Sequence, residues 1–174
     1  CVYSITESPS LQKILSRLTL SKKFYAAYPS SSYPEILYKS KRAYNCLLID
    51  VHSEYFVCIP YRSHILHSHA FLFKSSKRSK RTRSGLDYSK MVIIKNQDYI
   101  SNQSGVIDQD EYTETMRNIA RIAAEAAAYL ELYVNHKSGK APLDNKQFQR
   151  HFGCSTLPYF DSELGIALQP PKAV

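Results

Sequence analysis

The stretch that decides the fold is YNCLLIDVHSEYFVCIP, residues 44–60. It contains two apolar runs, 44–51 and 54–60, which are joined by His52 and Ser53. Runs of this length that are rich in Val, Ile, Tyr and Phe are typical of buried strands. A short polar connection between two such runs is typical of a hairpin. We therefore expect a sheet that is built around this hairpin.

Other segments add strands and helices to the hairpin. Residues 69–74 and 90–95 are short apolar runs that predict a third and a fourth strand. Residues 110–137 predict one long helix, and 144–152 and 155–164 predict two shorter ones. The long helix rests on one apolar stripe at alternating steps of four and three, made of Tyr112, Met116, Ile119, Ala123, Ala126, Leu130 and Tyr133.

The order of these elements predicts an α+β protein, and 174 residues suit a single domain over 1–174. Residues 2–6 alternate apolar and polar, as a short strand does. Residues 10–20 have apolar side chains at helical spacing, so we expect a helix there, with 1–17 as a possible N-terminal extension. The Ser-, Tyr- and Pro-rich stretch 29–34 reads as a loop, and 168–174 reads as a loose tail.

The charge favours a polyanionic partner, because 23 Lys and Arg against 15 Asp and Glu give a net charge of +8. The excess is concentrated in KSSKRSKRTRS, residues 74–84, which has six cations, no acid and no apolar side chain. Such a segment has little surface to bury, so we expect a mobile loop. No apolar run has the length of a membrane-spanning helix, and residues 1–20 show no secretory signal.

The four cysteines, Cys1, Cys46, Cys58 and Cys154, form no CxxC pair. A disulfide scaffold is not expected at this size, and the cytosol is the natural compartment for reduced thiols. A zinc site would need further ligands beside His52, and none stands at a workable spacing, so we expect neither a metal nor another cofactor.

The best candidate for chemistry is IPYRSH, residues 59–64, followed by His67 and His69. Pro60 is expected to end the buried strand, so that Arg62, Ser63 and His64 emerge at the rim of the sheet. RNA cleavage needs an imidazole for proton transfer and a guanidinium for the phosphate, and both are present. The alternative is that these histidines are ordinary loop residues.

Two other segments supply candidate partners for this motif. In GLDYSK, residues 85–90, Asp87 could orient a histidine or an arginine and Lys90 could meet a phosphate. Equally, Gly85 could turn the chain while Asp87 bonds the local backbone. In YKSKR, residues 38–42, the cations could grip a phosphate or simply be solvated.

Together, the segment from Lys23 to Phe73, which includes IPYRSH, and the following RSGLDYSKMVII resemble the toxins of type III toxin–antitoxin systems. The nearest branch is CptN/TenpN-like, with ToxN/AbiQ toxins as more distant relatives. The resemblance implies a compact, bent antiparallel sheet flanked by helices, with a core like that of the Kid/MazF toxins. It implies a bacterial, cytoplasmic endoribonuclease that leaves 2′,3′-cyclic phosphate and 5′-hydroxyl ends without a metal. The implied partners are cellular RNA and a pseudoknot antitoxin RNA, processed from tandem repeats, in a closed protein–RNA assembly.

The resemblance also implies site residues. Ser63 and Arg62 follow the strand in the family pattern, His67 fits the spacing of close relatives, and Asp87 and Lys90 fall in the GLD motif. The catalytic set that we expect is Ser63, Arg62, His67, His64, Lys90 and Asp87, with His67 or His64 handling a proton. The RNA-binding set is Tyr38, Lys41, Arg42, Tyr61, Lys77, Arg78, Lys80, Arg81 and Arg83.

Two other functions fit the same residues. A non-catalytic nucleic-acid-binding regulator would use the same basic surface and cleave nothing. A hydrolase with Ser63 as its nucleophile would form a covalent adduct with a fluorophosphonate.

Overall fold

The computed structural model describes residues 11–38, 44–49 and 55–167. At its centre lie strands β2 (Tyr44–Ile49) and β3 (Tyr55–Arg62), paired antiparallel from Tyr44 opposite Pro60 to Ile49 opposite Tyr55. The predicted hairpin is therefore confirmed, although its connection lies outside the described residues. Pro60 does not end the strand as predicted, because β3 continues to Arg62.

Strand β3 holds together two small antiparallel sheets. Its first half pairs with β6 (Val92–Ile94), and its last two residues pair with β5 (Gly85–Asp87). Strand β4 (Ala70–Leu72) lies on the other side of β5, and the order of strands is β4-β5-β3-β2-β1-β7, with β6 beside β3. The predicted third and fourth strands are β4 and β6, and the fold is α+β as predicted.

The predicted helix over 10–20 is wrong, because this segment is strand β1 (Leu11–Leu20), between β2 and β7 (Ile100–Ser104). The register of β1 against β2 shifts between Leu11 and Lys13 and again between Leu15 and Leu18. A bulge adds one residue to the strand, so the period of two is interrupted and apolar residues fall three or four apart. Residues 11–17 thus belong to the sheet rather than to an extension, and 2–6 lie outside the described residues.

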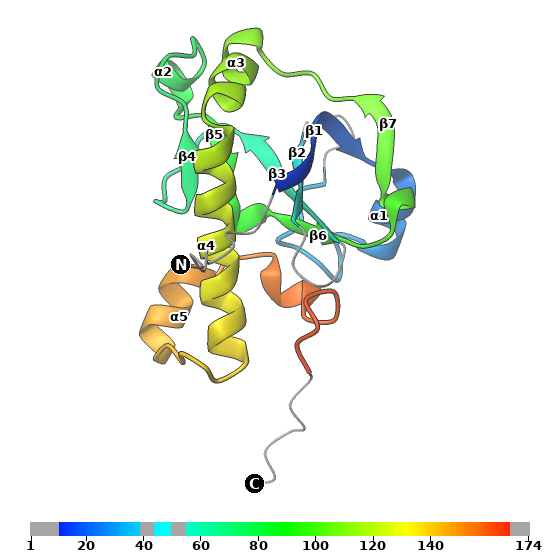
Figure 1. The fold of residues 1–174 in the computed structure, drawn as a ribbon, viewed down its shortest axis with the longest axis vertical. Coiled ribbons are helices and arrows are strands. Elements are labelled where there is room, and N and C mark those ends of the chain that lie inside the picture. The colour runs from blue at the N-terminus through cyan, green and yellow to red at the C-terminus, as the bar shows by residue number, and fades with distance from the viewer. Residues whose placement is uncertain (1–10, 39–43, 50–54, 168–174) are drawn as a thin grey trace, which may run out of the picture.

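The long helix is divided into α3 (Gln109–Arg117) and α4 (Ile119–Lys137). At the division, the amide group of Asn118 donates to the carbonyl of Glu114, a local bond that competes with the helical ladder. The inward stripe also differs from the prediction in α3, where Glu111 and Thr115 are buried and Met116 is exposed. In α4 the predicted stripe holds for its C-terminal half. Figure 1 shows α3 and α4 following one another along one side of the sheet.

The remaining elements close the core around the sheet. They are α1 (Lys22–Ala27), α5 (Asn145–Phe152) and three 3-10 turns, η1 (Tyr88–Lys90), η2 (Gln97–Tyr99) and η3 (Leu157–Phe160). The predicted helix over 144–152 is confirmed as α5, capped by Asp144, whereas 155–164 forms only η3. The expected loop at 29–34 contains neither helix nor strand. Among the helices described, none has the length and apolarity to cross a bilayer.

The basic segment 74–84 was predicted to be a loop throughout, and the structure shows otherwise. It contains a short helix, α2 (Ser79–Thr82), and it packs against α3 through the fully buried carboxylate of Glu111. Glu111 accepts hydrogen bonds from the hydroxyls of Ser76 and Ser84 and pairs with the guanidinium of Arg78. The segment has no apolar side chain to bury. It is held instead by the hydrogen bonds and the ion pair that satisfy the buried charge of Glu111.

Candidate active site

The centre of the site is the carboxylate of Asp87, which is fully buried at the end of β5. Strand β5 lies so close to β4 that a Cβ on Gly85 would stand only 2.2 Å from the backbone oxygen of Phe71. Gly85 therefore permits a close approach of two strands and does not turn the chain. On its other side, β5 pairs with β3, and Arg62 at the end of β3 lies opposite Gly85. This pairing places Arg62 within reach of Asp87.

Both oxygens of Asp87 are fully used. Its Oδ2 accepts from Nη1 of Arg62 at 2.5 Å and lies 3.3 Å from Nε2 of His67. Its Oδ1 accepts from the hydroxyl of Ser89 at 2.7 Å and from the backbone N–H of Ser89 at 3.0 Å. A buried carboxylate with this many partners is held in a fixed position. Asp87 thus orients the guanidinium and the imidazole, and also bonds local backbone.

The imidazole of His67 has a defined orientation. Its Nδ1 accepts from the backbone N–H of His69 at 3.2 Å, so in the neutral ring the proton lies on Nε2 and faces Asp87. The hydroxyl of Ser89 is 3.4 Å from the same Nε2. The side chain of His67 is 36% exposed and that of Arg62 is 25% exposed. Both groups can therefore reach a bound molecule.

Ser63 and His64 lie where β3 leaves the sheet. Ser63 is half-buried, and its hydroxyl has no hydrogen-bond partner among the residues that the structure describes. His64 is exposed and has a φ of 60°, in the left-handed region that few non-glycine residues adopt. This backbone turn aims the chain toward the basic segment.

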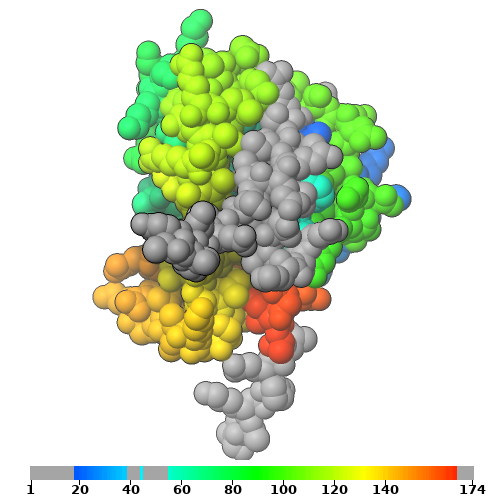
Figure 2. Space-filling model, viewed as in Figure 1, coloured from blue at the N-terminus to red at the C-terminus, as the bar shows by residue number. Residues whose placement is uncertain are grey.

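The basic segment is attached directly to the turn at His64. The backbone N–H of His64 donates to the carbonyl of Thr82 at 2.5 Å, and that of Ile65 donates to the carbonyl of Arg83 at 3.2 Å. Five cations of the segment are exposed: Lys74, Lys77, Lys80, Arg81 and Arg83. In Figure 2 the basic segment forms the upper left edge of the molecule beside α3. A strongly cationic surface therefore adjoins the cluster around Asp87.

Several predicted site residues are used elsewhere. The ammonium of Lys90 is only 10% exposed and is bound by Glu35 and by the carbonyl of Cys154. Tyr61 is wrong as an RNA contact, because it is buried and its hydroxyl donates to Thr115. Arg78 is committed to Glu111 and Asp108, so its main role is structural.

Tyr38 is 63% exposed and packs edge-on against Tyr25, so its ring remains accessible. Lys41 and Arg42 lie outside the described residues, and their predicted role in RNA binding stays a prediction.

Three residues join the cluster that the sequence did not indicate as site residues: Ser89, Tyr129 and His151. His69, which follows the IPYRSH motif but was not placed in the expected catalytic set, also joins it. The ring of His69 lies 6.0 Å from that of His67, 5.3 Å from Tyr129 of α4 and 5.0 Å from His151 of α5. The hydroxyl of Tyr129 donates to the carbonyl of His151. A separation of more than eighty residues between His67 and His151 hides this contact from any local motif. The sequence offered one indication of this cluster, namely that His67 and His69 stand two residues apart.

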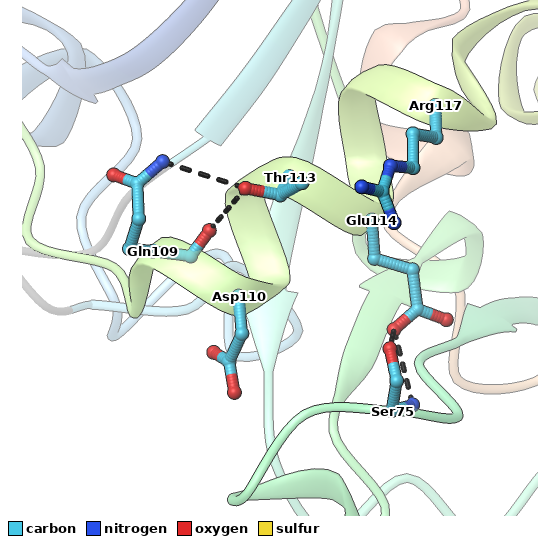
Figure 3. A pocket seen from close by; sticks show the side chains of 6 residues that line it. All are labelled: Ser75, Gln109, Asp110, Thr113, Glu114 and Arg117. Carbon is cyan, nitrogen blue, oxygen red and sulfur yellow. Dashed lines mark hydrogen bonds between the residues drawn. The ribbon is translucent and has the colours of Figure 1, made fainter.

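A separate hollow of about 430 Å³ lies where the basic segment meets α3, and Figure 3 shows the six side chains that line it. Its carboxylates are already engaged. Glu114 accepts from the backbone N–H groups of Lys74 and Ser75 and from the Ser75 hydroxyl, and Asp110 accepts from the N–H of Lys77. The hydrogen bond from the N–H of Lys77 is the main cause of a lowered pKa of Asp110. The hollow is therefore part of the attachment of the basic segment rather than a second reaction centre.

In comparisons with known proteins, no family model, no curated protein and no solved structure matched the chain. Within the described ranges, no group of three or more His, Cys, Asp or Glu side chains is arranged to hold a metal ion. The function must therefore be argued from the cluster around Asp87 and the basic surface beside it.

Proposed function

We propose that the protein is the endoribonuclease toxin of a type III toxin–antitoxin system. The observation that carries the proposal is the buried network in which Asp87 holds Arg62 and His67 at the rim of the sheet, next to the cationic surface of 77–83. A polyanion with a reactive phosphodiester is the ligand that such a surface and such groups fit together. The sequence resemblance names the class of nuclease.

Arg62, His67 and Ser63 each have a separate role in the proposed reaction. Arg62 uses one nitrogen for Asp87 and has further N–H donors for the oxygens of the scissile phosphate. His67 keeps Nε2 toward Asp87 and exchanges a proton at Nδ1, the nitrogen that accepts from the His69 N–H in the absence of RNA. The hydroxyl of Ser63 donates to the phosphate. The 2′-oxygen attacks phosphorus, and the 5′-oxygen leaves as a hydroxyl.

The basic surface binds the RNA backbone on either side of the cut. Substrate and antitoxin are the same polymer, so both use these cations, and a folded pseudoknot RNA inhibits by covering the site. We also propose a Kid/MazF-like core, and the observation that supports it is that β3 is shared between two small antiparallel sheets. We place the protein in the bacterial cytoplasm, where both RNAs are found.

Incubating the purified protein with RNA of mixed sequence in EDTA tests the proposal. Cleavage that persists without divalent ions supports a metal-independent nuclease. Tight binding with intact RNA would instead favour a non-catalytic regulator. Labelling by a fluorophosphonate at Ser63 would favour a serine hydrolase.

Replacing Ser63 by alanine is expected to lower the cleavage rate by about 100-fold, since one donor to a developing charge is commonly worth that much. The fold should persist, because the hydroxyl bonds no described residue. Single-turnover cleavage measures the effect, with the exposed Ser68→Ala as a control from the same loop. A Ser63→Ala variant that cuts at the wild-type rate would remove Ser63 from the site.

Replacing four of the exposed cations, Lys77, Lys80, Arg81 and Arg83, by glutamine is expected to flatten the salt dependence of RNA binding. Each lost phosphate contact should lower the slope of log K against log salt by about 0.7 to 0.9. Filter binding at several salt concentrations gives the slope. The control, Lys22→Gln with Lys140→Gln, removes exposed charges elsewhere. Equal slopes for the two variants would mean that the basic segment does not touch RNA.

A further inference from the structure

We infer that His69 is a further catalytic residue of the site, the general base that removes the proton from the 2′-hydroxyl. This inference rests on the proposed function and names a group that IPYRSH and GLDYSK do not include. The proposed reaction requires two proton transfers. The attacking and leaving oxygens lie on opposite sides of phosphorus, so one imidazole cannot serve both, and a second proton-transfer group is needed nearby.

The geometry provides such a second group. The rings of His67 and His69 are 6.0 Å apart and tilted by 30°, and both side chains are half-buried. At this spacing they can reach two oxygens of one phosphate. The other neighbouring histidine, His151, has its Nδ1 enclosed and without a hydrogen-bond partner among the described residues, so this nitrogen faces the interior.

The surroundings of the two rings differ in the way that acid and base require. His67 faces the carboxylate of Asp87, with Nε2 at 3.3 Å from Oδ2. His69 faces Tyr129 and His151, with His67 beside it and Asp87 farther off. Burial, and then the charge of His151, lower the pKa of His69, although the carbonyl of Arg150 and Asp87 oppose this. The surroundings of His69 thus favour the neutral ring, which is the form that can accept a proton.

The step balances without a co-reactant. The proton of the 2′-hydroxyl passes to His69, and the freed electron pair of the 2′-oxygen forms the bond to phosphorus. The bond from phosphorus to the 5′-oxygen breaks, and its electron pair stays on that oxygen. The 5′-oxygen then takes the proton from His67. The products are a 2′,3′-cyclic phosphate and a 5′-hydroxyl.

The test uses His69→Gln and His69→Phe, with His136→Gln as the control. His136 accepts a hydrogen bond from the Leu143 N–H and packs on Phe148, away from the cluster. Phenylalanine keeps the aromatic packing on Tyr129 and His151 but cannot accept a proton. Both His69 variants should cleave RNA at least about 100-fold more slowly than wild type, while the control is unchanged.

Two readouts separate a base from a packing residue. A substrate with sulfur in place of the 5′-oxygen at the mapped cut has a leaving group that needs no acid, so it should restore His67→Gln and leave both His69 variants slow. In wild type, acid should reduce kcat/KM as His69 becomes protonated, with the midpoint below the ordinary histidine value of 6.5. That acid limb should disappear in His69→Gln.

Cleavage at the wild-type rate by His69→Phe, rescue of His69→Gln by the sulfur substrate, or an unchanged acid limb would overturn the inference. A wild-type protein that cuts no RNA would instead refute the proposed function itself.

Discussion

Replacing Asp87 by asparagine is expected to reduce RNA cleavage by about 100- to 1,000-fold, the range found when a charge-stabilising group is removed from an active site. The amide has nearly the same shape but no charge. Arg62 would lose the partner that now lies at 2.5 Å, and a protonated His67 would lose its counter-ion. Both groups would then be poorly aimed at the phosphate. Single-turnover kinetics well below the melting temperature measure the loss.

The control for this variant is Asp98→Asn. Asp98 also pairs with a cation, Lys23, at 2.7 Å, but both side chains are largely exposed, and such pairs contribute little. Cleavage by Asp98→Asn should equal that of wild type. If the folded Asp87→Asn protein retained wild-type cleavage, the cluster around Asp87 would have no part in the chemistry.

Replacing Glu111 by alanine is expected to give a large loss of stability. The change leaves the hydroxyls of Ser76 and Ser84 and the charge of Arg78 without their buried partner. Removing one member of a buried ion pair costs about 3 kcal/mol or more, and the low end applies because Arg78 is partly exposed to water. A loss of that size lowers Tm by about 6 to 12 °C in a protein of this length.

Calorimetry measures the change in Tm, and hydrogen exchange over residues 76–84 shows whether the basic segment loosens as expected. Glu131→Ala is the matched control, because Glu131 is an exposed carboxylate on α4. An equal Tm for both variants, with unchanged exchange in the basic segment, would show that Glu111 does not hold that segment in place.

The sequence predicts best where burial alone decides the structure. The runs that became β3 and β6 are apolar because the core surrounds them, and Asp144 caps α5 through purely local bonds. The same reasoning gave a wrong prediction for β1, where bulges bring apolar residues to a helical spacing. It also gave the wrong buried stripe for α3, which contains Glu111 and Thr115. Polar residues that pair inside a protein cannot be told from solvated ones by periodicity.

The candidate site shows the same division. Arg62 and Asp87 come together because β3 and β5 pair, and His67 joins them from the loop after β3. The local motifs were sufficient to name all three. The partners of Lys90 and Tyr61 lie far along the chain, so the sequence could not show that these side chains were already engaged. His151 reaches the cluster from α5 for the same reason. Long-range contacts decide which candidate groups are available.

The most direct measurement of the central claim is the structure of the RNA ends. Wild-type protein in EDTA is given an RNA with one mapped cleavage site, and the same RNA with a single 2′-deoxy sugar at that site. The account predicts a 2′,3′-cyclic phosphate and a 5′-hydroxyl from the first, no cut in the second, and almost no product from Asp87→Asn. Cleavage of the 2′-deoxy RNA at the same bond, or a 5′-phosphate end, would contradict it.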